Sequence, residues 1–160
     1  MLRFKKLSDS DSGMMLVSNE FSDSDWPVRF VIRVMYTDYY DSEWTKTAGK
    51  YHVEVHATSF AACGKKEIDR ASESASEDIA EMSPEWQAVA LVEYGTSANL
   101  WQKTGNNLAE LLKSARKELA LISMLFGFYM DKPLNAIGST GWDWIRGDIL
   151  AGLKTANNDS

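Results

Sequence analysis

The sequence predicts an α+β fold, in which an N-terminal, mostly antiparallel sheet of 3–4 strands packs against a C-terminal set of about 4 helices. Three observations support this prediction. Apolar and polar residues alternate with a period of two in the first 60 residues, the period becomes helical from Lys65, and residues 107–130 form one long apolar-faced helix. Strands therefore precede helices instead of alternating with them. We expect a single domain over residues 1–154 and a frayed polar tail over 155–160.

The predicted sheet begins with a hairpin of residues 2–7 and 14–18, joined by a Ser- and Asp-rich turn. The strongest strands cover residues 27–36 and 50–58, where side chains alternate in character along the chain. Between them, residues 38–49 read as an exposed hairpin loop.

Helical periodicity from Lys65 places an apolar stripe along residues 65–82. Ser83 and Pro84 then begin a helix with Trp86 on its core seam, and Gly95 suits a left-handed end. Residues 97–104 read as a turn or a single helical turn. A last helix, over residues 140–153, begins at a capping box of Thr140 and Asp143.

The central helix, residues 107–130, begins with Asn107 and Glu110 in capping-box spacing. From Leu119 it is apolar on nearly every side, so it must be enclosed by protein or lipid. The apolar run is much shorter than the about 20 residues that span a bilayer. We therefore expect this helix to be buried at the centre of the core.

Composition limits the classes of function. The net charge of −6 argues against a general binder of the phosphate backbone, and 44% hydrophobic residues are typical of a folded globule. A single cysteine excludes an internal disulfide, and the N-terminus has no apolar signal segment. We expect a cytoplasmic protein that neither enters a membrane nor needs a cofactor.

The sharpest chemical pattern is His52, Glu54 and His56, which share one strand face. These side chains could bind a metal in a metal-dependent enzyme, although ligand spacing along one strand is wide for a single ion. A second alternative is a sheet face that binds single-stranded nucleic acid through Arg29, Arg33, Lys50 and the histidines. The simplest interpretation is a solvated face with cross-strand ion pairs, in which Arg29 or Arg33 pairs with Glu54.

Cys63 precedes a predicted helix and is followed by two lysines. Both features would lower the pKa of its thiol. No catalytic signature surrounds it, however, and a small residue packed at a strand–helix junction is the interpretation that we favour.

Acidic residues concentrate in 67–93, where Arg70 is the only base. Four residues of helix rise about 6 Å, so Glu73, Glu77 and Glu81 would form a regular row on one helix, widened by Asp69 and Asp78. Tyr39, Tyr40 and Trp44 lie in the acidic loop and could anchor a protein contact. No catalytic motif competes with these features. We therefore expect a non-enzymatic adaptor or inhibitor that docks on a basic protein surface, such as that of a nucleic-acid-binding protein, as a phage or mobile-element anti-defence protein would.

Overall fold

The computed structural model describes residues 2–21, 27–37, 50–95 and 97–129, with the backbone alone for 123–129. Its strands are β1 (Phe4–Ser10), β2 (Gly13–Ser18), β3 (Arg29–Thr37), β4 (Lys50–Thr58) and β5 (Ala98–Gly105). Its helices are α1 (Lys65–Ala75), the short 3-10 helix η1 (Ile79–Glu81), α2 (Pro84–Tyr94) and α3 (Leu108–Tyr129).

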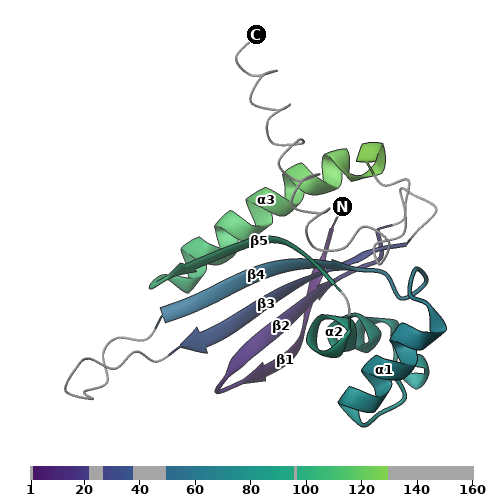
Figure 1. Cartoon of the computed structure of the whole chain (residues 1–160). Coiled ribbons are helices and arrows are strands. Elements are labelled where there is room, and N and C mark those ends of the chain that lie inside the picture. The colour runs from purple at the N-terminus through teal and green to yellow at the C-terminus, as the bar shows by residue number, and fades with distance from the viewer. Residues whose placement is uncertain (1, 22–26, 38–49, 96, 130–160) are drawn as a thin grey trace.

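The five strands form one antiparallel sheet in the order β1-β2-β3-β4-β5. Neighbours in the sequence are neighbours in the sheet, and α1, η1 and α2 fill the connection between β4 and β5. Helices lie on both faces: α3 on one, and α2 with α1 outside it on the other (Figure 1). The α+β class is confirmed. The predicted division into an N-terminal sheet and C-terminal helices is wrong, because a fifth strand follows α2.

The main core lies between the sheet and α3. Alternate residues of β3 and β4 point to this side, and the seam of α3 covers them, so both halves of the predicted pattern meet. The buried residues of this core include Phe30, Ile32, Val34, Val53, Val55, Leu111, Ala115, Leu119 and Ile122.

A second, smaller core lies on the opposite face. Ala88, Val89 and Val92 of α2 cover the apolar side chains of β2 and β3, which are Met15, Val17 and Val31. Ala90 points to the other side of α2 and packs with α1 and η1 through Ala71 and Ile79. The side of the sheet that carries the histidines is therefore partly covered by a helix rather than wholly solvated.

The predicted β1–β2 hairpin is confirmed, with β1 extending to Ser10. Gly13 follows its turn and lies against β3. A Cβ atom at this position would clash with the carbonyl oxygen of Val34, so the close approach of the two strands requires glycine.

Strand β5 occupies residues for which the sequence predicted a turn. Trp101 pairs with Val55 and Asn99 pairs with His56, so Leu100 is an extra residue in a β-bulge. Because of the bulge, Leu100 and Trp101 both contact the α3-side core. Two consecutive apolar residues on one side break the period of two, so the sequence pattern did not predict a strand here.

The helix predicted over residues 65–82 ends at Ala75. Ser76 adopts the left-handed conformation, with φ 57°, and the backbone N–H of Ile79 donates to Ser72 Oγ at 3.1 Å. Asp78 then accepts from the backbone N–H of Ala80 and caps η1. The apolar stripe is real, but a turn divides the helix that carries it.

The predicted helix ends are confirmed in part. Asn107 Oδ1 accepts from the backbone N–H of Glu110 at 3.2 Å, as expected, and Pro84 begins α2. The side chain of Ser83 forms no cap hydrogen bond. Gly95 is not left-handed, since its φ is −110°. Its Cβ would instead crowd Leu91, which explains a glycine here.

The expected burial of the central helix holds on its seam, where Leu119 and Ile122 are 2% and 3% exposed. The expectation of complete enclosure is wrong at Ala120, which is exposed, and Leu121 is only partly buried. Side chains beyond Ile122 and the predicted helix over 140–153 lie outside the described residues.

Candidate functional site

His52, Glu54 and His56 form a hydrogen-bonded cluster on the α2 side of β4. Nε2 of His52 lies 3.3 Å from Glu54 Oε2, and Nε2 of His56 lies 3.1 Å from Glu54 Oε1. Arg33 faces Glu54 across β3 and β4, with its guanidinium 3.9 Å from Oε1. One carboxylate therefore joins two imidazoles and a guanidinium.

Each imidazole also bonds to a hydroxyl group near β5. Nδ1 of His52 lies 2.8 Å from Thr104 Oγ1, and Nδ1 of His56 lies 2.9 Å from Ser97 Oγ. The antiparallel register produces these bonds, because His52 pairs with Thr104 and His56 pairs with Asn99, two residues after Ser97. The cluster thus ties the edge strand β5 to β4 through side chains.

The environment of Glu54 determines which nitrogen atoms of the two imidazoles carry protons. The hydrogen bond from His56 holds the pKa of Glu54 below its usual value, against the opposing effect of burial, and His52 and Arg33 contribute further. Glu54 is therefore an ionised acceptor at neutral pH, so each Nε2 carries a proton. In neutral imidazoles, each Nδ1 must then accept a hydrogen bond from Thr104 or Ser97.

This geometry gives the metal alternative no support. The two Nε2 atoms contact different oxygens of Glu54 and do not converge on one point, and both Nδ1 atoms are engaged by hydroxyl groups. In the parts of the chain that the structure describes, no group of three or more His, Cys, Asp or Glu could hold a metal ion.

The nucleic-acid alternative gains no support either, because the basic groups of this face are already engaged. Arg29 donates to the Ser18 carbonyl at 3.2 Å and lies 3.9 Å from a Glu20 oxygen. Arg33 faces Glu54, and α2 packs on the same side of the sheet. The simplest prediction, a cross-strand ion pair, is confirmed for Arg33 and not for Arg29.

The five acidic residues predicted to bind a partner are all exposed, but they do not form a row on one helix. Two lie on α1, two follow in the turn after it, and one is in η1. In chain order they are Asp69, Glu73, Glu77, Asp78 and Glu81. We call these five residues the acidic surface. No ion pair within the described part of the chain involves them.

The aromatic residues predicted to contact a partner, Tyr39, Tyr40 and Trp44, lie outside the described residues. The structure instead exposes Trp86 and Tyr94 on α2, at 43% and 46%. Placing Trp86 in the core was wrong. The sequence could not reveal this, because α2 is apolar on most sides and its periodicity does not mark one buried face.

Cys63 does not have the environment of a reactive thiol. Burial and, after it, the neighbouring Glu67 together raise its pKa to about 12, which is opposite to the predicted effect of the lysines. Its Sγ donates to the Ser59 carbonyl at 3.3 Å. The interpretation as a packed small residue agrees with this geometry.

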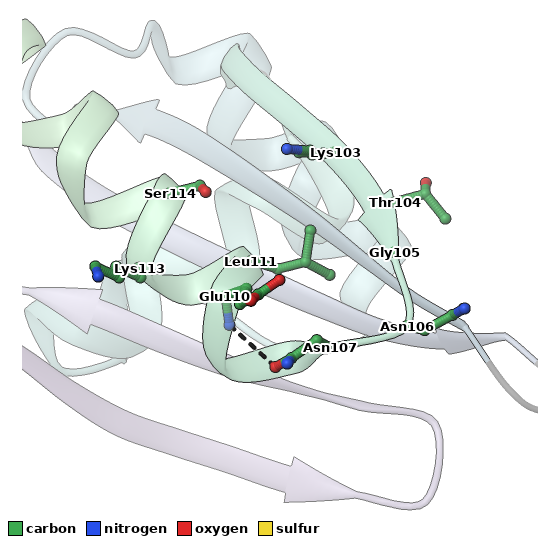
Figure 2. Close-up of a pocket in the computed structure, with 9 residues that line it drawn as sticks. All are labelled: Lys103, Thr104, Gly105, Asn106, Asn107, Glu110, Leu111, Lys113 and Ser114. Carbon is green, nitrogen blue, oxygen red and sulfur yellow. Dashed lines mark hydrogen bonds between the residues drawn. The ribbon is translucent and has the colours of Figure 1, made fainter.

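Two pockets lie outside the histidines, and the first of them includes Thr104, the hydrogen-bond partner of His52. One, of about 430 Å³, lies where β5 leads into α3 and is lined mostly by polar residues, among them Lys103, Asn106 and Lys113, together with the buried Leu111. Figure 2 shows the side chain of Thr104 pointing away from that of Lys103, as expected for neighbours on a strand. The other pocket, of about 210 Å³, lies between Arg29 and the start of α2. Neither contains the histidines.

Comparison of the chain with protein-family models, with curated proteins and with solved structures finds no match. Among the described helices, none has the length and apolar character needed to cross a membrane.

Proposed function

We propose that this chain binds another protein, one with a basic surface, through the acidic surface of α1 and η1 and the exposed aromatic side chains of α2. The observation that carries the proposal is the exposure of these five acids without an ion-pair partner in the described part of the chain. Unpaired carboxylates can steer a basic partner and pair with its lysines or arginines.

Exposed aromatic side chains supply the second part of such an interface. Trp86 and Tyr94 lie on α2, which packs against both α1 and η1. Trp and Tyr are enriched among residues that dominate binding energy, and their rings also attract arginine and lysine side chains. A basic partner therefore complements both features.

The position of Glu73 supports a role other than local stability. It lies in the last turn of α1, where no basic residue is present. A negative charge at the C-terminal end of a helix is unfavourable to the helix dipole by about 0.3–1 kcal/mol. A lysine here would suit the helix better, so the acid is not explained by the fold.

Affinity purification tests the proposal, with an extract of the native host or of the cell that a phage or mobile element carrying this protein would enter. The full chain serves as bait, together with a variant that carries Glu73→Lys, Glu77→Lys and Glu81→Lys. We expect the wild type to retain a basic protein that the variant loses. A matched control, Asp9→Lys, Asp11→Lys and Glu110→Lys, makes the same change in net charge at exposed sites elsewhere.

Equal capture by the wild type and by the variant that reverses Glu73, Glu77 and Glu81 would exclude this surface. Equal loss in both variants would show that overall charge, rather than the acidic surface, is responsible. Circular dichroism confirms that each variant is folded. The identity of the captured protein then tests the proposed class, an inhibitor or adaptor from a phage or mobile element.

A further inference from the structure

The side chains of Ser97, His56 and Glu54 form a continuous hydrogen-bonded series. Ser97 Oγ lies 2.9 Å from Nδ1 of His56, and Nε2 of the same ring lies 3.1 Å from Glu54 Oε1. Both distances are within the range of direct hydrogen bonds. A hydroxyl, an imidazole and a carboxylate in this order are the parts of an activated nucleophile.

The direction of these hydrogen bonds follows from the ionised carboxylate. Glu54 can only accept, so the proton of the His56 ring is on Nε2. Nδ1 then has a free electron pair directed at the Ser97 hydroxyl, which donates. This is the arrangement in which a neutral imidazole can take the hydroxyl proton, with the two ring nitrogens in exchanged roles relative to the serine proteases.

Burial separates this series from the matching series on the other side of Glu54. The side chain of His56 is 9% exposed, whereas that of His52 is 24% exposed. His56 is therefore fixed between Ser97 and Glu54, while Ser97 itself remains partly exposed and can meet a reagent. Thr104 is the hydroxyl of the other series, and it is the more hindered, secondary alcohol.

We propose that Ser97 is a nucleophile towards activated carboxylic esters, with His56 as its general base and Glu54 as the residue that positions the ring. Ser97 Oγ attacks the carbonyl carbon, and its proton moves to Nδ1 of His56. The bond to the leaving alcohol breaks, and the imidazolium returns the proton to that alcohol. Water then attacks the acyl-serine by the same proton transfers, which releases the acid and restores Ser97.

This inference does not depend on the binding surface proposed above. A general base typically contributes 10²–10⁴-fold to such a reaction, so removing His56 has a large expected effect. The His56→Gln variant keeps a polar side chain of similar length, and Thr104→Ala provides a matched control that removes the hydroxyl of the other series.

The test is labelling of the full chain with a fluorophosphonate, followed by mass spectrometry of its peptides. Attack by Ser97 forms the Oγ–P bond, expels fluoride and leaves one adduct on Ser97. We expect no adduct in Ser97→Ala, labelling at least about 100-fold slower in His56→Gln, and an unchanged rate in Thr104→Ala. Absence of the adduct in the folded wild type, or an adduct that persists in Ser97→Ala, would overturn the proposal.

Rescue by a conservative variant separates a positioning role of Glu54 from a structural one. We expect Glu54→Asp, which keeps the carboxylate, to be labelled faster than Glu54→Gln, which keeps the side-chain size, with circular dichroism showing that both variants are folded. Equal labelling rates in the two folded variants would show that Glu54 acts only through the fold.

Discussion

Glu54 and His56 lie two residues apart on β4, and their side chains meet at 3.1 Å on the same face of the sheet. Their contact places a carboxylate that is 14% exposed beside an imidazole that is 9% exposed. Because the partners are on one strand, the bond itself adds no long-range contact. Contacts with neighbouring segments link the pair across the sheet. The histidines bond to Ser97 and Thr104 on one side, and Glu54 faces Arg33 of β3 on the other.

Replacing Glu54 with glutamine should therefore weaken the fold. The amide can accept from only one imidazole, and its NH₂ group then faces the other donor. We expect a loss of about 1–3 kcal/mol in the free energy of unfolding, measured by urea denaturation. Glu81→Gln is the control, since Glu81 is exposed, and should change stability by less than about 0.5 kcal/mol. Equal effects of the two variants would show that the cluster adds nothing to stability.

The same carboxylate predicts how stability depends on acid. The pKa of Glu54 is lower in the folded chain than its ordinary value of 4.5, so folding favours the ionised form. Its contribution is complete above pH 4.5 and is lost as the pH falls through the folded value. The stability difference between the wild type and Glu54→Gln should be constant above pH 4.5 as far as this carboxylate determines it, and should shrink as the pH falls below 4.5. A difference that is constant or grows in acid contradicts the assignment.

The thiol of Cys63 should react slowly. With a pKa of about 12, it holds far less thiolate at pH 8 than an ordinary cysteine does. We expect alkylation by iodoacetamide to be on the order of 100-fold slower in the folded chain than in urea. Equal rates in the two conditions would show that Cys63 is not protected.

The contact of α3 with the sheet should contribute strongly to stability. Leu119 is 2% exposed in the main core, so Leu119→Ala should cost about 2–5 kcal/mol in thermal or urea unfolding. Arg116 is exposed on the same helix, and Arg116→Ala should stay within about 0.5 kcal/mol of the wild type. Similar losses in both variants would mean that α3 is not anchored along its apolar seam.

The sequence predicts those parts of the fold in which one regular period persists. Strands β3 and β4 and the seam of α3 satisfy this condition, and their side chains lie where the alternation placed them. Strand β5 does not, because the bulge at Leu100 puts consecutive apolar residues on one side. Helix α1 ends at Ala75, before the predicted residue 82. The turn that follows includes a hydrogen bond from the backbone N–H of Ile79 to the Ser72 hydroxyl, seven residues apart, which the periodicity does not indicate.

The candidate site was predictable only within one strand. The spacing of His52, Glu54 and His56 reveals that they share a face, and the structure brings them into contact. Ser97 directly precedes β5 and Thr104 lies in it, and their approach to the histidines depends on the bulged register of a strand that the sequence did not reveal. The exposure of Trp86 was also not predictable, because Trp86 lies on a helix with apolar residues on most sides.

The central claim about function is that the acidic surface binds a basic partner. The affinity for the captured partner tests this claim most directly. The dissociation constant should rise at least about 10-fold when Glu73, Glu77 and Glu81 become lysine, and by less than about 3-fold when Asp9, Asp11 and Glu110 do. An equal rise for the two variants, or no change in either, would contradict the claim.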